Sequence, residues 1–209
     1  MPQPIKMMSW SPSPGAVLQR PHHAMMIAAI AAEWTQVESS MIRLLAGAYG
    51  RTLFNADGPR DVEHHPVAVA AMEAAETIRA RIKLLDLSLG RLVVGARVEA
   101  KWIEVRDNLQ KRARERNRVV HGHWGIEANE PDDLVLQTLD GYFRWTVADL
   151  EAVFERIVAL RRDVVRLTNS IMMAVHSGEI PEGVMGPQTG WVVGYDEHVE
   201  IKEGDSEPR

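Results

Sequence analysis

Apolar residues recur at helical spacing over four long stretches of the chain. Residues 22–49 carry them every three or four positions, which predicts one apolar face on a helix about seven turns long. Residues 66–89 and the stretch from about Ala96 to Val120 show the same pattern. Residues 150–174 alternate spacings of three and four, which is typical of a helix bundle or of a helix–helix dimer contact.

The pattern changes between the third and the fourth stretch. "LVLQTLDGYFRW", residues 134–145, is two short apolar or aromatic runs around Asp140-Gly141, a pair that suits a type I′ turn. Thr146 follows as a candidate N-cap, with Asp149 three residues later. We therefore expect an all-α protein, an up-and-down four-helix bundle with a β-hairpin inserted before the last helix.

The two ends of the chain lack such periodicity. Residues 1–20 are rich in proline and serine with no apolar run, so we expect a disordered N-terminal tail rather than a signal peptide. Residues 176–209 are rich in acidic residues, glycine and proline, and we expect a mostly disordered C-terminal tail. Residues 21–175 would then form the helical domain. "NADGPRD", residues 55–61, reads as a turn and loop.

Composition narrows the class of protein. The chain has 209 residues and 45% hydrophobic residues, enough for one well-packed domain. It has no cysteine, which excludes disulfides and a thiol nucleophile. No stretch approaches the roughly 18 uninterrupted apolar residues of a membrane span. We expect a cytoplasmic protein without a membrane partner.

Charge is distributed unevenly along the chain. The net charge is −5, but residues 176–209 hold eight acidic and two basic residues, so the rest of the chain is about +1. Residues 101–118 hold seven basic and three acidic residues. Such a basic stripe serves an anionic partner or is simply a solvated helix face. The acidic tail could also compete with nucleic acid for the basic residues.

The most informative stretch is "RERNRVVHGHW", residues 114–124. Arg116-Asn117, three further residues, then His121 and Gly122 resemble the signature of the HEPN superfamily. The resemblance implies a small helical bundle with the motif at the end of a long basic helix. It further implies a metal-independent endoribonuclease that acts as a homodimer, with two motifs meeting in one cleft. Many members are toxins paired with a nucleotidyltransferase antitoxin, and others only bind.

The residues of this stretch suit RNA cleavage. The reaction needs a base for the ribose 2′-hydroxyl and an acid for the leaving oxygen, and a histidine such as His121 serves either role. Arg116 can stabilise the negative charge of the phosphorane, and Asn117 can hold the imidazole or contact phosphate. The residues expected to bind the RNA backbone without reading its sequence are Arg112, Arg114, Arg118 and His123. No cofactor and no metal are expected.

In an ideal helix, Arg116 and His121 lie on different faces. At about 100° per residue, Arg116 lies about 140° from His121, so the two do not touch in a continuous helix. They meet if the helix ends before Gly122, or if His121 meets Arg116 of a second subunit, and we expect a homodimer. Glu38 falls within the apolar stripe of the first helix, whereas Glu33 points outward. Glu38 either orients Arg116 across the bundle or reaches water at the bundle edge.

Three alternative interpretations remain at this stage. Trp102 and Trp124 either stack on a base or belong to the core. The histidine pairs at residues 22–23, 64–65 and 121/123 suggest zinc, but none has the spacing of a helical ligand pair. The chain could also be a non-enzymatic helical dimer that binds an anionic ligand or a partner protein. The placement of Arg116 and His121 discriminates between a nuclease and a non-enzymatic scaffold. In a nuclease the two side chains should lie together in an open cleft, and in a scaffold they should be buried and apart.

Overall fold

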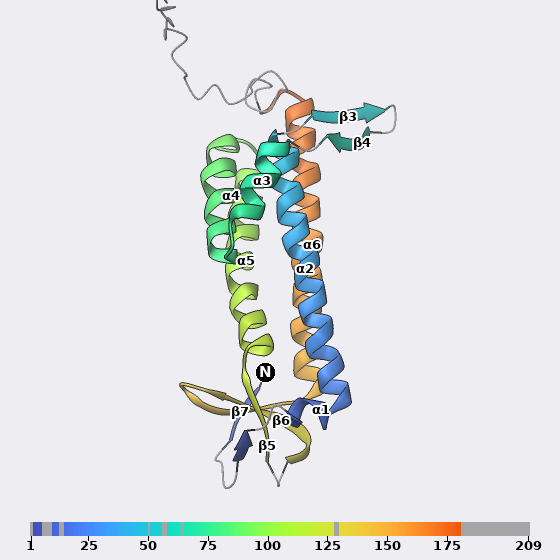
Figure 1. The fold of residues 1–209 in the computed structure, drawn as a ribbon. Helices are drawn as coiled ribbons and strands as arrows, with labels where there is room; N and C mark the ends of the chain where they lie inside the picture. Colours follow the sequence, from blue (N-terminus) through green and yellow to red (C-terminus); the bar gives the residue numbers. More distant parts are fainter. Residues whose placement is uncertain are drawn as a thin grey trace, which may run out of the picture.

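The computed structural model describes residues 2–5, 10–12, 15–49, 51–55, 58–63, 65–127 and 130–180. Three long helices run along the molecule: α2 (Pro21–Tyr49), α5 (Glu99–Val120) and α6 (Val147–His176). The shorter α3 (Pro66–Ala74) and α4 (Ile78–Leu92) pack beside them at one end, and α1 (Gly15–Leu18) lies near the start of α2 (Figure 1). The described part of the chain is therefore mostly helical.

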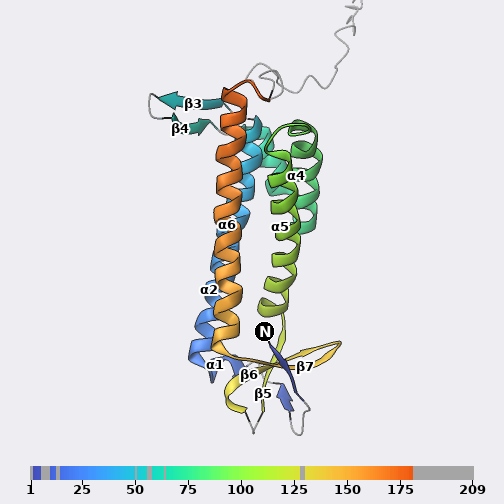
Figure 2. The same ribbon diagram turned by 180° about the vertical axis from the view of Figure 1, so that it is seen from behind.

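A small antiparallel sheet closes the other end of the bundle, where α5 ends and α6 begins (Figure 2). Its strand order is β1-β7-β6-β5-β2. The central strands are β5 (His123–Glu127), β6 (Glu130–Thr138) and β7 (Gly141–Trp145), and the edges are β1 (Gln3–Pro4) and β2 (Trp10–Pro12). A separate hairpin, β3 (Arg51–Asn55) with β4 (Gly58–Glu63), lies at the opposite end (Figure 1).

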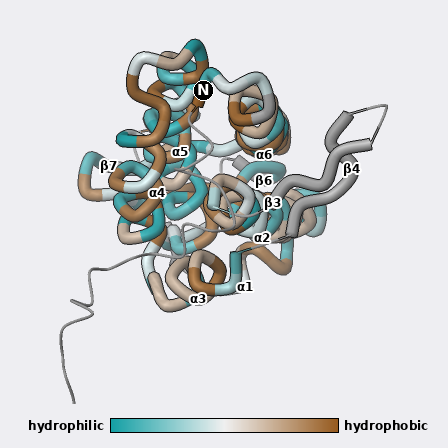
Figure 3. Tube along the Cα trace, turned by 90° about the horizontal axis from the view of Figure 1, so that it is seen from above, coloured by the Kyte–Doolittle hydropathy of each residue, from teal (hydrophilic) through white to brown (hydrophobic). Residues whose placement is uncertain are grey.

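One continuous hydrophobic core runs through the bundle and reaches the sheet. Seen along the bundle, the helices surround a common centre and carry apolar and polar positions on different sides (Figure 3). The stripe of α6 is buried throughout, with Leu150, Ile157, Val164 and Leu167 each at 0% exposure. It packs against α2 and α5 of the same chain. The seam predicted for α6 is thus a seam of the monomer's own core.

Several predicted elements are confirmed. The first and last helices have the expected extent, and Thr146 caps α6 with a reciprocal capping box to Asp149. The Thr146 hydroxyl accepts from the Asp149 N–H at 3.1 Å, and the Asp149 carboxylate accepts from the Thr146 N–H at 3.2 Å. The hairpin of residues 134–145 is also present, with Leu134 opposite Trp145. These features rest on local sequence signals.

The second helix is two helices. The chain is extended at Ala75 and Thr77, and the Thr77 hydroxyl caps α4 by accepting from the Ala80 N–H at 3.1 Å. Because the break resets the helical phase, α3 buries Ala68 and Met72, whereas one continuous apolar stripe would bury Val67, Ala71 and Ala74. A threonine cap inside an apolar period is easily overlooked, since its neighbours keep the expected spacing.

The hairpin turn also differs from the prediction. Thr138 pairs with Gly141, so the central residues are Leu139 and Asp140. Both have negative φ, which excludes a type I′ turn, and Gly141 takes the positive φ of 126°. The glycine therefore serves the turn one position later than expected.

The fold is not all-α, and the expectation of a disordered segment over residues 1–20 is wrong for its described parts. Residues of that segment form β1, β2 and α1. Both strands are two or three residues long and lie at the edges of the sheet, where proline is tolerated. The stretch of residues 55–61, expected to be a loop, belongs largely to a hairpin, because Asn55 ends β3 and residues 58–61 lie in β4. Residues 181–209, most of the expected acidic tail, lie outside the described residues.

Candidate functional site

Arg116 and His121 meet within one chain. Helix α5 ends at Val120, and His121 is its C-cap with φ −109° and ψ 10°. The His121 N–H still bonds to the Asn117 carbonyl at 3.0 Å, but the ring leaves the helical course. Nη1 of Arg116 lies 3.0 Å from Nε2 of His121. The end of the helix thus resolves the 140° separation without a second subunit.

The hydrogen bonds of Arg116 define the state of this pair. A guanidinium only donates, so in this hydrogen bond Nε2 of His121 is the acceptor. The same Nη1 donates to Oδ1 of Asn117 at 3.0 Å. Among the described residues, the N–H groups of Nη2 have no partner, and Nε is buried without one. Arg116 is therefore oriented by its neighbours and keeps donors free.

Gly122 fixes the course of the chain directly after His121. A Cβ at this position would lie 2.2 Å from Cδ1 of Leu136 and 2.4 Å from the Arg118 carbonyl oxygen. Real Cβ atoms do not approach so closely, and the carbonyl belongs to the backbone. Glycine after the histidine thus has a steric reason: it lets the chain pass between the end of α5 and strand β6.

His121 opens onto a depression of about 560 Å³. The end of α5 and the start of β5 form one side, and the β6–β7 turn forms the other. Its lining residues are Asn117, Arg118, His121, Gly122, His123, Leu136, Gln137, Thr138, Leu139 and Asp140. The side chains of His121, His123 and Leu139 are exposed. The candidate site is therefore an open surface site, accessible to a large ligand.

Of the residues expected to bind RNA, three lie close to this depression and one does not. Arg118 and His123 border it directly, and Arg114 borders a neighbouring groove that shares Asn117. Arg112 instead forms an ion pair with Glu115, which also pairs with Arg156 of α6 at 3.3 Å. With 11% exposure, the Arg112 side chain belongs to the α5–α6 contact and does not line the depression, and its expected role in RNA binding stays a prediction.

The expected contact between Glu38 and Arg116 is not formed. Oε1 of Glu38 accepts from the Trp34 indole at 3.0 Å, and Oε2 lies 3.3 Å from Nη1 of Arg81 on α4. Glu38 stands 17 residues into α2, roughly 25 Å from the end that meets the sheet, whereas Arg116 lies near that end. Glu33, expected to point outward, is the less exposed of the two and pairs with Arg161.

Both tryptophans considered for base stacking belong to the core. Trp102 is 1% exposed and Trp124 is 8% exposed. The Trp124 indole donates to the Val119 carbonyl at 2.9 Å, and its ring meets Trp145 edge-on at 5.8 Å. Trp124 thus ties the end of α5 to the sheet and supports the site from behind.

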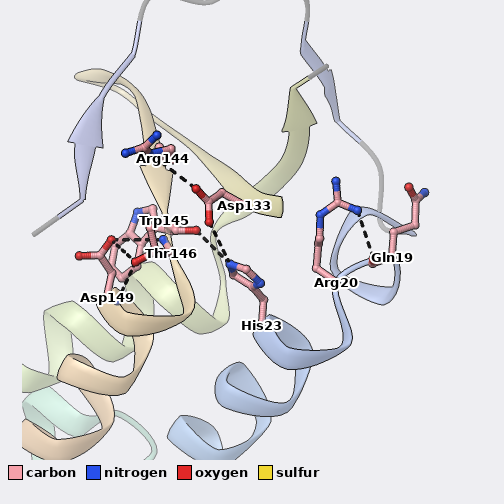
Figure 4. A network of polar contacts seen from close by, with 8 residues as sticks. All are labelled: Gln19, Arg20, His23, Asp133, Arg144, Trp145, Thr146 and Asp149. Carbon is pink, nitrogen blue, oxygen red and sulfur yellow. Dashed lines mark hydrogen bonds and ion pairs between the residues drawn. The ribbon is translucent and has the colours of Figure 1, made fainter. Parts of the chain in front are cut away.

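Sequence analysis missed a second histidine cluster, built around His23 (Figure 4). The His23 ring is 3% exposed, and its Nε2 lies 3.0 Å from the Trp145 carbonyl oxygen and 4.0 Å from Asp133. Asp133 in turn lies 3.7 Å from Nε of Arg144. The cluster joins the first turn of α2 to β6 and β7. A histidine among apolar neighbours carried no sequence signal for these long-range contacts.

Both arguments for a homodimer are accounted for within the single chain. The stripe of α6 is buried against the chain's own helices, and Arg116 reaches His121 of the same chain. The homodimer therefore stays a prediction, and neither of these two observations supports it any longer.

The acidic tail starts far from the site. Helix α6 begins at the sheet and ends at the opposite end of the bundle (Figure 1), and its 30 residues span about 45 Å. Beyond it, Arg97 pairs with Glu179 and its hydrogen bonds lower the pKa of that carboxyl. Residues 181–209 lie outside the described residues, so the expected competition by the acidic tail stays a prediction.

The described part of the chain contains neither a candidate metal site nor a candidate membrane span. No group of three or more histidine, aspartate or glutamate residues there is arranged to hold a metal ion. His65 stands before α3, at the other end of the bundle from His23 and His121 (Figure 1). No helix described is both long and apolar enough to cross a bilayer.

Comparison with known proteins identified no relative of the chain. No family model, no curated protein and no solved structure matches the chain. The assignment of function therefore depends on the geometry of the site and on the resemblance carried by residues 116–122.

Proposed function

We propose that the protein is a metal-independent endoribonuclease of HEPN type with Arg116 and His121 at its centre. One observation carries the proposal: a guanidinium and an imidazole lie 3.0 Å apart at an open depression. Scaffold arginines and histidines are usually buried or separately paired, as Arg112 and His23 are here. The Arg116–His121 pair keeps exposed ring atoms and free guanidinium donors instead.

The reaction would be a transesterification. Nε2 of His121 takes the proton of the ribose 2′-hydroxyl, and the 2′-oxygen attacks phosphorus. The bond to the 5′-oxygen breaks and leaves a 2′,3′-cyclic phosphate. Arg116 stabilises the added negative charge through Nη2. His123 borders the same depression and would protonate the leaving oxygen.

Substrate binding would also activate the base. In the free protein, Nη1 of Arg116 donates to Nε2 of His121 and so occupies its lone pair. A phosphate oxygen is a stronger acceptor than an imidazole nitrogen, because its hydrogen bond carries charge on both sides. A phosphate that recruits Nη1 and Nη2 releases Nε2 for the 2′-hydroxyl. The pair thus exchanges an internal contact for two contacts with substrate.

The test is cleavage of a fluorescent single-stranded RNA in the presence of EDTA. We expect cyclic-phosphate products from wild type and a loss of at least about 100-fold with Arg116→Ala. RNA with a single 2′-deoxy substitution should resist cleavage at that position. His22→Ala, which changes an exposed histidine at the same end of the bundle, should cleave at the wild-type rate. EDTA-sensitive cleavage, or equal rates for wild type and Arg116→Ala, would refute the proposal.

A second candidate function is binding without cleavage, as in members of the family that only bind. The observation that favours it is the occupied lone pair of His121 Nε2. Under this alternative, wild type binds RNA with no product over hours, and His121→Ala binds as tightly as wild type.

A further inference from the structure

A second groove lies next to the depression, between α4 and α5. It has a volume of about 720 Å³. The two helices run antiparallel, so the start of α4 faces the end of α5, and Asn117 lines both the groove and the depression. The groove is lined by Ile78, Arg79, Ile82, Lys83, Asp86, Gln110, Ala113, Arg114 and Asn117. It therefore continues the Arg116–His121 site along the bundle.

The cations of this groove form no ion pairs, whereas eight arginines elsewhere in the described chain do. In the described residues, Arg79, Lys83 and Arg114 form no ion pair, and neither does Arg118 beside them. Eight other arginines have acidic partners: Arg81, Arg97, Arg106, Arg112, Arg144, Arg156, Arg161 and Arg166. The groove's one carboxylate, Asp86, is itself paired with Arg106 at 3.2 Å. The groove therefore carries uncompensated positive charge.

The floor of the groove is apolar. Ile82 and Ala113 are 5% and 6% exposed, and Ile78 is half-buried. Charged rims over an apolar floor suit a ligand with an anionic backbone and apolar faces. Single-stranded nucleic acid has both, because its unpaired bases and sugars can contact the floor while its phosphates meet the rims. A duplex turns only its charged backbone toward such a floor.

The length of the groove sets the length of the ligand. From Gln110 to Asn117, helix α5 rises about 10 Å, which matches about three stacked nucleotides at about 3.4 Å each. We infer that the α4–α5 groove binds the segment of single-stranded RNA that adjoins the scissile phosphate, with Arg79, Lys83 and Arg114 on successive phosphates. This inference rests on the proposed function for its orientation toward His121.

Binding to a non-cleavable RNA tests the groove independently of cleavage. The probe is a fluorescent twelve-nucleotide single strand with 2′-O-methyl groups throughout, titrated by anisotropy at several salt concentrations. Arg79→Gln/Lys83→Gln should weaken binding at low salt by at least about tenfold and reduce the salt slope by about 1.4. The matched control is Arg91→Gln/Arg162→Gln, which removes two exposed, unpaired cations outside the groove and should change affinity less than about twofold. Equal losses in the two double variants would overturn the inference.

Substrate length separates a failure of the groove from a failure of the active site. If the proposed function holds, the groove variant should cleave a dinucleoside monophosphate at the wild-type kcat/KM and the twelve-nucleotide RNA at a reduced one. Absence of cleavage in every protein, with the binding difference retained, would refute the nuclease and leave the groove. Equally tight binding of the matching duplex would overturn the single-strand assignment. An oligoglutamate peptide of equal charge that binds as tightly as RNA would point to an acidic protein partner and would likewise overturn it.

Discussion

His23 and His121 both lie at the sheet end of the bundle, but His23 is held in a closed set of contacts and His121 in an open one. His23 is 3% exposed and its Nε2 is bonded to a backbone carbonyl that no ligand can displace. His121 is exposed and its Nε2 accepts from Arg116, whose remaining donors are free. The first arrangement holds α2 against the sheet, and the second can exchange its internal contact for a ligand.

The difference lies in the partners rather than in the histidines. Asp133 and the Trp145 carbonyl surround His23 with fixed acceptors, and Arg144 balances the carboxylate. Around His121 the cations are Arg116 and Arg118, with no ion pair for either in the described residues, and the exposed Asp140 borders the depression from the β6–β7 turn. A closed polar network stabilises a fold, whereas unpaired cations at an open surface favour an anionic ligand.

The largest expected effect concerns the shape of the Arg116 side chain. Arg116→Lys keeps the charge but not the planar fork that reaches both Asn117 and His121. We expect kcat/KM for RNA cleavage to fall about 100-fold with no change in the unfolding midpoint. Arg91→Lys on α4 is the control and should be neutral. Full activity of Arg116→Lys would show that charge alone suffices.

The closed cluster should respond in stability instead. His23→Ala leaves a cavity and an unpaired carbonyl at the junction of α2 with the sheet. We expect a loss of about 3 kcal/mol in the free energy of unfolding, measured with urea. His22→Ala, next to it but exposed, should change stability by less than about 0.5 kcal/mol. A His23→Ala protein as stable as wild type would remove the structural role.

Gly122 belongs to both kinds of region, because it directly follows His121 of the open site and packs closely against Leu136 of the sheet. In Gly122→Ala, the new methyl group collides with Leu136 and with the Arg118 carbonyl. We expect destabilisation of about 2 kcal/mol together with reduced cleavage, since the backbone after His121 must move. Reducing the obstacle with Gly122→Ala/Leu136→Ala should restore cleavage in part. Unchanged stability of the single variant would contradict the close approach.

The smallest expected effect separates Glu38 from the site. Glu38→Gln removes the charge of a partly exposed carboxylate that pairs with Arg81. It should lower the free energy of unfolding by less than about 1 kcal/mol. Cleavage should not change, because Glu38 contacts Trp34 and Arg81 rather than Arg116. A large loss of activity with stability preserved would restore the orienting role that the sequence suggested.

Local signals in the sequence predicted the fold more successfully than long-range ones. The cap at Thr146 and the periods of α2 and α6 depend on residues close in sequence, and the structure confirms them. The edge strands β1 and β2 depend on pairing with strands more than a hundred residues away, and their short proline-containing sequences gave no period. The break at Thr77 was hidden because apolar spacing continued across it.

The site shows the same division. Asn117, Arg118 and His121 lie within five positions of one another, and all three line the depression. The contact between Arg116 and His121 could not follow from an ideal helix, because it needs the helix to end at Val120 and a long side chain to bend back. The prediction for Glu38 was wrong because a helical wheel gives the direction of a side chain around the helix axis. It does not tell which neighbouring helix lies at the same level along the bundle.

The most direct test of the account compares His121→Ala with His23→Ala in one experiment. Single-turnover cleavage of single-stranded RNA is measured below the unfolding transition of each protein, and the unfolding free energy is measured in the same buffer. We expect His121→Ala to cleave at least about 100-fold more slowly with wild-type stability, and His23→Ala to cleave at the wild-type rate with reduced stability. Wild-type cleavage by His121→Ala would contradict the central claim that the open pair is the reacting site.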